Sequence, residues 1–230
     1  MPTYFIGIDL AWGEKNASGF CVLQKSEGHL EIVELQLLYS IEEIFQAVKK
    51  YQNSTLYVGV DAPLIVPNRE GNRAIEKAFN KDFAPYKIAM LPVNRNIMTQ
   101  YTDIIRSETL YTLLNTLTFT QGKLTLFEVY PHATIAVCFH NNKILPYKRK
   151  KGRNSTFIRE QLLIYRSFLE AVIESHTIFS ENIELLKGKN LKHYEDKLDA
   201  ITSAYTLYYT QNNPHKIYKL EDKELFITPI

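Results

Sequence analysis

The sequence has little cysteine, and it lacks a long apolar run. Its 230 residues include only two cysteines, Cys21 and Cys138, which lie far apart in strand-like apolar segments. We expect both to be reduced thiols that pack as small apolar side chains. No apolar run approaches the ~20 residues that span a bilayer, and no signal-peptide pattern follows Met1. We therefore expect a cytoplasmic protein that does not associate with membranes.

The net charge is also small. The formal charge is only +2, from 27 basic and 25 acidic residues. This excludes attraction of nucleic acid by the whole surface, so such binding would depend on a local patch. One basic run exists, Lys148 to Arg153, in which five of six residues are basic. It either contacts phosphates or is a solvated loop before a helix.

Several common motifs are missing. The nine glycines form neither G-x-G-x-x-G nor G-x-x-x-x-G-K-[ST], which argues against dinucleotide-fold and P-loop phosphate sites. The absence of G-x-S-x-G disfavours an α/β-hydrolase. His132, Cys138 and His140 lack the spacing of a zinc site.

The sequence instead contains short apolar runs with the patterns of strands and helices. Apolar runs separated by turn residues predict an antiparallel meander of three strands, over 4–10, 18–24 and 30–37. Ser40 and Glu43 have the spacing of a capping box, and apolar residues at helical spacing follow them. A fourth apolar run, 55–61, resembles the first and ends in an acid. Strand, helix and strand in succession imply a parallel crossover.

The remaining pattern predicts a cap and more helices. The stretch from about 68 to 96 is polar and interrupted by prolines, so we expect an irregular cap or insertion beside the site. Beyond it we predict a helix over 102–117, a fifth strand over 123–129, and helices over 155–174 and 193–211. The chain is thus predicted to be a single α/β domain over 1–230, with a five-stranded mixed sheet flanked by helices.

Acidic side chains end two of the predicted strands. Asp9 ends the first strand and Asp61 ends the fourth, while the last helix carries Asp196 and Asp199 three residues apart. Clustered carboxylates repel one another unless a cation compensates them, and Mg²⁺ or Mn²⁺ prefers such oxygen ligands. A divalent metal site that hydrolyses phosphoesters is one interpretation. The other is that the strand aspartates cap turns and Asp199 is an exposed residue.

Five ordered motifs resemble those of a known family. They are Gly7 to Trp12, Val58 to Leu64, Glu128 to His132, Pro146 to Lys148, and Lys197 to Ala200. In this order they resemble the family called domain of unknown function 429, which is regarded as predicted nucleases of ribonuclease H fold. The resemblance implies a ribonuclease H-like sheet and matches its three aspartates to Asp9, Asp61 and Asp199. Asp199 is preferred over Asp196 because it fits the motif and lies beside Leu198 in the half-buried stripe of the helix.

Four further residues are candidates for the site. Glu128 lies near the end of the fifth strand, one strand further out, and is ranked below the three aspartates. Arg73, which the resemblance also covers, could hold a substrate phosphate or form an exposed ion pair. Lys148 could neutralise a leaving phosphate or be solvated, and His132 could be a general base or hold its loop. Glu195 is expected to be solvated.

Three functions remain open at this level. The first is a nuclease or phosphodiesterase that uses Mg²⁺ or Mn²⁺ on nucleic acid or nucleotides. The second is a non-catalytic module that binds nucleic acid or protein through the basic run. The third is an ATP-binding phosphotransferase, because Gly7 to Leu10 resembles the first phosphate motif of sugar kinases, actin and Hsp70. Those proteins duplicate their core domain, for which 230 residues leave no room. The sequence identifies no protein partner.

Overall fold

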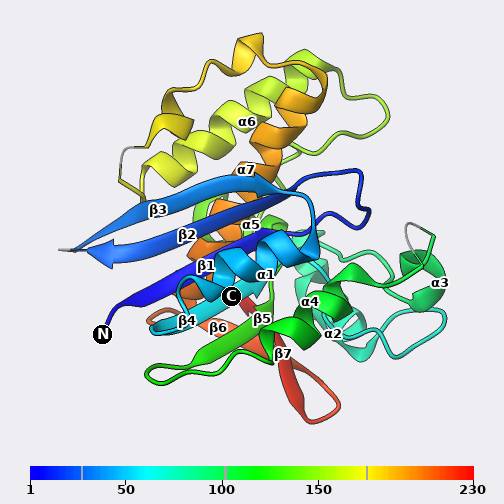
Figure 1. Ribbon diagram of the computed structural model, residues 1–230. Coiled ribbons are helices and arrows are strands. Elements are labelled where there is room, and N and C mark those ends of the chain that lie inside the picture. The colour runs from blue at the N-terminus through cyan, green and yellow to red at the C-terminus, as the bar shows by residue number, and fades with distance from the viewer. Residues whose placement is uncertain (27, 101–102, 175) are drawn as a thin grey trace.

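The computed structural model describes residues 1–230 except 27, 101–102 and 175. A mixed sheet of seven strands lies at its centre, with helices on both faces (Figure 1). Across the sheet the strands are β3 (His29–Leu38), β2 (Ser18–Ser26), β1 (Thr3–Asp9), β4 (Thr55–Val60), β5 (Leu124–Glu128), β7 (Lys223–Pro229) and β6 (His215–Leu220). The predicted mixed α/β class is therefore confirmed.

The strand pairing agrees with the prediction in its first part. β1, β2 and β3 form the antiparallel meander, β4 runs parallel to β1, and β5 runs parallel to β4. The predicted number of five strands was wrong, because β6 and β7 form an additional hairpin that joins the sheet through β5. Lysines interrupt the apolar pattern of β6, so its sequence gives only a weak strand signal.

Helices form a layer on each face of the sheet. Their bounds are α1 Ile41–Lys49, α2 Ala74–Phe83, α3 Arg95–Met98, α4 Arg106–Leu114, α5 Pro131–Phe139, α6 Ser155–Glu170 and α7 Gly188–Thr210, with short 3-10 helices at Ala84–Tyr86, Thr177–Ser180 and Ile183–Leu185. Apolar residues of α1, α2 and α4 pack on one face, those of α6 and α7 pack on the other, and α5 contributes apolar residues to both cores. No helix in residues 1–26, 28–100, 103–174 or 176–230 is long and apolar enough to cross a membrane.

Some predicted elements differ from those observed. The stretch 68–96 contains the regular helix α2, where an irregular segment was expected. The helix predicted over 102–117 is the shorter α4, and its predicted first residue lies outside the described residues. Cys138 lies in α5 rather than in a strand. This segment has many apolar residues, and apolarity alone does not separate a buried helix from a strand.

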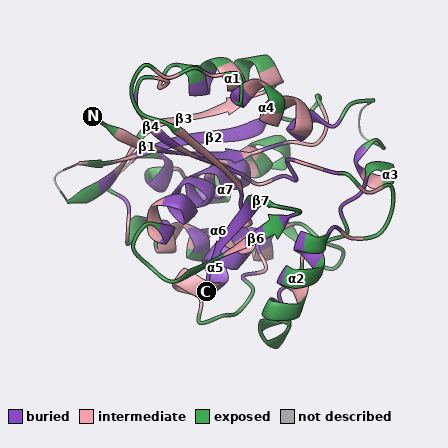
Figure 2. Ribbon diagram, turned by 90° about the horizontal axis from the view of Figure 1, so that it is seen from below, coloured by how far each residue is buried: buried purple, intermediate pink, exposed green. Residues whose placement is uncertain are grey.

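Helix α7 lies directly against the sheet. Figure 2 shows it buried beneath the strands. A Cβ atom on Gly7 of β1 would lie 2.0 Å from the carbonyl oxygen of Ala200, and one on Gly19 of β2 would lie 2.1 Å from that of Asp196. These two glycines therefore permit the backbone of α7 to approach β1 and β2. The close approach brings the acidic turn of α7 to the end of β1.

Candidate functional site

The side chains of Asp9 and Asp61 lie on the same face of the sheet. Side chains alternate along a strand, so Asp9 shares a face with Phe5, which packs with α7, while Ile8 faces the opposite core. Asp61 follows β4 directly, and its backbone N–H donates to the carbonyl of Ile8 over 2.8 Å. Both aspartates are half-buried and face the α7 layer. The predicted neighbourhood of the two strand ends is confirmed.

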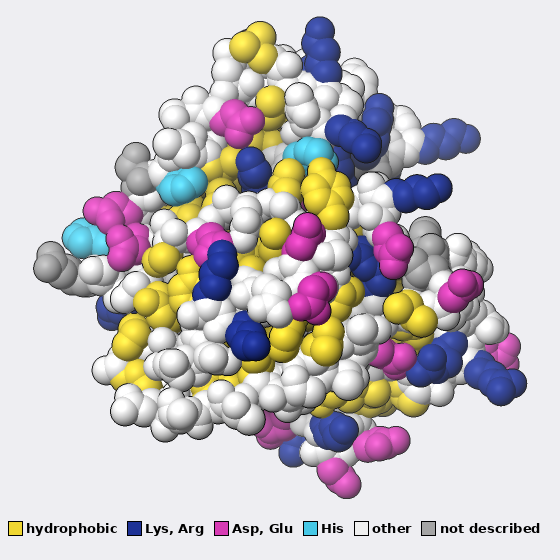
Figure 3. Space-filling view, in the orientation of Figure 1, with side chains coloured by type: hydrophobic (Ala, Val, Ile, Leu, Met, Phe, Trp, Pro, Cys, Tyr) yellow, Lys and Arg dark blue, Asp and Glu magenta, His cyan; other side chains and the backbone are white. Residues whose placement is uncertain are grey.

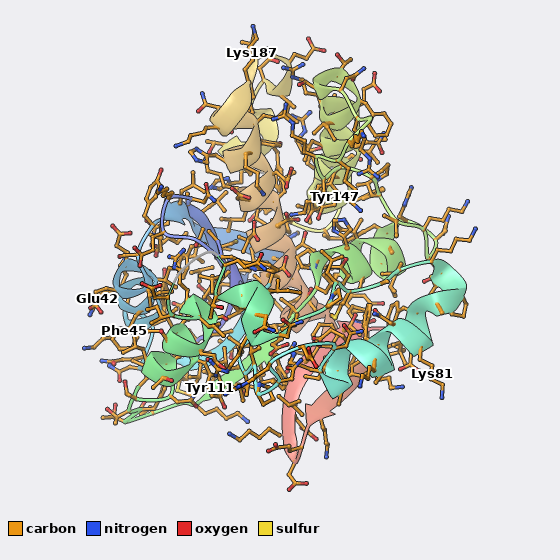
Figure 4. All side chains as sticks on the ribbon, turned by 90° about the vertical axis from the view of Figure 1, so that its right-hand side faces the viewer. Glu42, Phe45, Lys81, Tyr111, Tyr147 and Lys187 are labelled. Atoms are coloured by element: carbon orange, nitrogen blue, oxygen red, sulfur yellow. The ribbon has the colours of Figure 1, made fainter. Side chains whose placement is uncertain are left out.

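Asp199 completes this group from α7. Its carboxylate is fully buried and accepts hydrogen bonds from the hydroxyls of Tyr147 at 2.6 Å and Tyr165 at 3.0 Å. It also accepts a bond from the ammonium of Lys148. The expectation of an exposed Asp199 is excluded. Figure 4 shows Tyr147 where the α6 and α7 layer approaches the sheet, whereas Lys187 lies at the outer tip of this layer.

Two further acids of α7 pair with lysines beside Asp199. Glu195 is buried, contrary to the expectation of a solvated side chain, and lies 3.2 Å from the Lys148 ammonium. Asp196 is also buried and pairs with Lys192, which contacts Glu195 as well. We call these residues the carboxylate cluster: Asp9, Asp61, Glu195, Asp196 and Asp199, with Lys148 and Lys192. Five acids face two cations, so the fully ionised cluster is negative.

The aspartates of the cluster differ in their electrostatics. Burial raises the pKa of Asp61 to about 7, with a further contribution from the charge of Asp199. Burial likewise holds the pKa of Asp9 well above its usual value. Burial acts on Asp199 in the same direction, but Lys148, Lys192 and the Tyr147 hydroxyl together outweigh it and lower the pKa of Asp199. The charge of Lys148 is thus committed mainly to Asp199, and the two strand aspartates remain poorly compensated.

His132 lies at the outer end of a hydrogen-bonded chain. The Tyr147 hydroxyl donates to Asp199, so it accepts the 2.9 Å bond from Nδ1 of His132. Burial lowers the pKa of His132 to about 4, which makes its ring neutral at pH 7. His132 therefore reaches Asp199 only through Tyr147. Its role as a base stays a prediction.

Glu128 and Arg73 line a cavity together with Asp9 and Asp61, but they pair with each other and not with the three aspartates. Glu128 pairs in register with Val60, whose side chain faces the opposite core from Asp61. It accepts hydrogen bonds from the guanidinium of Arg73 at 2.7 and 2.8 Å. The same guanidinium donates to Glu76 and to the carbonyl of Ile65. All its N–H groups are engaged, so this geometry favours a structural role for Arg73.

Arg73→Lys is expected to lower the free energy of unfolding by about 2 kcal/mol, because a lysine cannot bridge Glu76 and Glu128 with paired hydrogen bonds. Urea unfolding followed by circular dichroism measures this change. Arg69→Lys, on an exposed side chain, is the matched control and should have no effect. Equal stability of both variants would show that the buried ion pairs contribute little.

Two cavities meet at Asp9. The first has a volume of about 230 Å³, and Asp61, Glu128 and Tyr130 contribute to its lining. The second has a volume of about 270 Å³, and Asp196 and Lys192 contribute to its lining. Asp9, Leu10 and Trp12 line both. In the space-filling view, acidic, basic and apolar side chains alternate over the surface (Figure 3). The site is therefore reached from two differently lined hollows.

Sequence reasoning missed two members of the site and set a third aside. Tyr165 and Lys192 have no distinguishing motif. Glu195 is one turn before Asp199 on the same helix face, but it was set aside because an acid near the start of a helix is usually solvated. Tyr147 was inside a recognised motif, Pro146 to Lys148, although no role was assigned to it.

Comparison with known protein families identifies one that matches this chain. The family model described as "Protein of unknown function (DUF429)" matches residues 7–215. This range contains all five motifs on which the resemblance was based and every residue of the carboxylate cluster. No protein with a curated description matches the chain.

Proposed function

We propose that this chain, which belongs to the DUF429 family, is a ribonuclease H-like phosphodiesterase that uses Mg²⁺ or Mn²⁺ to hydrolyse phosphoesters of nucleic acid or nucleotides. The sheet order supports the fold proposed, since β1 lies between the antiparallel β2 and the parallel β4. One observation carries the function: Asp9 and Asp61 line a cavity, and no described residue donates a hydrogen bond to either side chain. Poorly compensated carboxylates at a cavity wall are what a cation would bind.

The donor set fits a hard divalent cation. Carboxylate oxygens are the ligands that Mg²⁺ and Mn²⁺ prefer, and burial raises the pKa of Asp9 and of Asp61 by more than the charge of Lys148 lowers it. Among the described residues, no three His, Cys, Asp or Glu side chains already converge as a metal site. The ammonium of Lys148 already lies among the acids as a positive charge. Because the carboxylates do not yet converge, binding of a divalent cation would draw Asp9 and Asp61 together.

Each residue of the site has its own role in this proposal. Asp9 and Asp61 would hold the ion, with Asp199 as the third ligand or as the group that holds Lys148. A divalent ion at such a site supplies Lewis acidity, which acidifies water and stabilises charge on phosphoryl oxygens. The hydroxyls of Tyr147 and Tyr165 fix the orientation of Asp199. Lys148 would contribute positive charge next to a phosphate.

Calorimetric titration with Mn²⁺ tests the proposal. The wild type should bind Mn²⁺, and Asp9→Asn should lose at least tenfold in affinity while circular dichroism shows an unchanged fold. Asp222→Asn, on an exposed acid of the β6–β7 turn, is the matched control and should bind as the wild type does. Mn²⁺-dependent hydrolysis of nucleic acids and nucleotides would then be compared for the same proteins. Undiminished turnover by folded Asp9→Asn would remove Asp9 from the mechanism.

The affinity for Mn²⁺ should depend on pH. Because burial raises the pKa of Asp61 to about 7, its carboxyl group holds a proton below that pH, and binding must release it. Because the pKa of Asp9 is raised as well, we expect the affinity to increase at least tenfold per pH unit between about pH 5 and 6.5. The same titration in buffers with different ionisation enthalpies counts the protons released. A flat profile with no proton release would contradict this.

One observation favours a second candidate, a non-catalytic binding module. Lys148 already pairs with Asp199 and Glu195, so the cluster has an internal cation of its own. In such a module the lysine would be the permanent counter-ion of the acids. Wild-type protein that binds nucleic acid but neither binds Mn²⁺ nor hydrolyses any phosphoester would support this function.

A further inference from the structure

The first cavity has a mixed lining in which apolar and aromatic side chains predominate. Trp12, Pro63, Leu91 and Tyr130 contribute to it, next to the carboxylates of Asp9 and Asp61, while Arg73, Glu76 and Glu128 are its other charged residues. Leu91 is 77% exposed and is thus open to a ligand. A planar apolar group such as a nucleobase suits this lining, because bases stack on aromatic side chains without a fixed hydrogen-bond pattern. We call this hollow the apolar cavity.

The second cavity has basic side chains. Lys15, Lys189 and Lys192 line it together with Asn16 and His193. Lys192 pairs with acids of the carboxylate cluster, whereas Lys15 and Lys189 are exposed and have no ion-pair partner among the residues that the structure describes. Two uncompensated ammonium groups beside a hollow attract phosphate. We call this hollow the lysine cavity.

The two cavities adjoin at Asp9. Their volumes of about 230 and 270 Å³ are each below the ~300 Å³ at which pockets hold a drug-sized ligand. Each therefore suits a fragment, and they share a wall of Asp9, Leu10 and Trp12, over which a longer ligand would pass from one cavity to the other. A polymer in which bases alternate with phosphates matches an apolar hollow next to a basic one.

We propose that the substrate is single-stranded nucleic acid, with a base in the apolar cavity and the neighbouring phosphate in the lysine cavity, so that a phosphoester lies at Asp9. This rests on the proposed hydrolase function for its chemistry, but the binding path is argued from the cavities alone. A base in a duplex is stacked and paired, and could enter the apolar cavity only after flipping out. Single strands present their bases without that cost.

The basic run that the sequence emphasised is a weaker binding surface. Lys148 pairs with Asp199, and the guanidinium of Arg153 donates to the carbonyls of Pro146 and Lys148. These two side chains hold the loop in place. Only Arg149, Lys150 and Lys151 remain exposed there. They provide a matched control for the lysine cavity.

Fluorescence anisotropy tests the path with a labelled short oligonucleotide, as RNA and as DNA, in Ca²⁺ without Mg²⁺ or Mn²⁺. The double variant Lys15→Glu with Lys189→Glu should lose at least tenfold in affinity, and the slope of log K against log salt should fall by about 1.4. Lys150→Glu with Lys151→Glu carries the same charge change and should bind within about threefold of the wild type. Leu91→Glu, at the apolar cavity, should lose roughly fivefold or more. All these positions are exposed, so the variants should fold.

The possible outcomes distinguish binding of single strands along the two cavities from the proposed hydrolysis. Binding that is lost only in the cavity variants supports the path, even if Mn²⁺ produces no hydrolysis and the proposed function fails. Equal binding of a duplex, equal losses in the two double variants, or no binding of single strands would overturn the path. Mn²⁺-dependent hydrolysis of single strands at a rate unaffected by the cavity variants would also overturn it, and would leave the hydrolase function standing.

Discussion

Gly7→Ala is expected to lower the free energy of unfolding by at least about 4 kcal/mol, or to prevent folding altogether. The new Cβ would lie 2.0 Å from the carbonyl oxygen of Ala200 and 2.3 Å from the amide nitrogen of Ala204. Both are backbone atoms of α7, so no side-chain rotation relieves the overlap, and the helix must move away from β1. Thermal unfolding by circular dichroism measures the loss.

Gly13→Ala is the matched control for this change. A Cβ on Gly13 would meet no atom within 4 Å, so its stability should differ from the wild type by less than about 0.5 kcal/mol. Gly19→Ala should behave like Gly7→Ala, because its Cβ would lie 2.1 Å from the carbonyl oxygen of Asp196. Wild-type stability in Gly7→Ala would mean that α7 does not lie against β1 as described.

Asp199→Asn is expected to lower the free energy of unfolding by about 3 kcal/mol. The change leaves the half-buried Lys148 ammonium without its main partner, and an amide is a weaker acceptor for the Tyr147 and Tyr165 hydroxyls. We place the loss at the lower end of the range for a broken buried ion pair, since Glu195 still faces Lys148. Urea unfolding at pH 7 to 8 gives the value.

Asp61→Asn should have the opposite effect and increase the free energy of unfolding. Burial raises the pKa of Asp61 to about 7 in the folded protein, whereas the unfolded carboxyl group ionises near ~3.9. Between these pH values the unfolded state binds fewer protons, so increasing pH destabilises the folded wild type. The asparagine variant avoids this penalty and should be more stable by about 1 to 3 kcal/mol at pH 8, with the gain vanishing near pH 4. If Asp61→Asn, like Asp199→Asn, were less stable than the wild type at pH 8, the negative charge of Asp61 would be well compensated in the folded protein.

The sequence predicted the strand ends better than the contacts between layers. Asp9 and Asp61 were placed together because short apolar runs ending in acids are local patterns, and β1 does pair with β4. The place of Glu128 on the opposite face depends on its register with Val60, which only the folded sheet determines. Its partner Arg73 comes from a segment where no helix was predicted, so a buried ion pair between them was not foreseen.

The rest of the cluster could not be predicted for a similar reason. Lys148 was a candidate for contact with substrate, and its pairing with Asp199 joins residues 51 positions apart in the sequence. The close packing of α7 depends on Gly7 and Gly19, and a glycine inside a strand indicates a bulge or the close approach of another backbone without telling which of these it is or which segment approaches. Register and layer contacts are tertiary properties, whereas strand ends and helix caps are local.

The position of α7 in the chain has a consequence for protein synthesis. Asp9 and Asp61 leave the ribosome well before Asp199, and α7 can pack on β1 and β2 only after it has been synthesised. A nascent chain therefore has the strand carboxylates without the helix that completes the cluster. Until α7 packs on the sheet, Glu195, Asp196 and Asp199 cannot join Asp9 and Asp61.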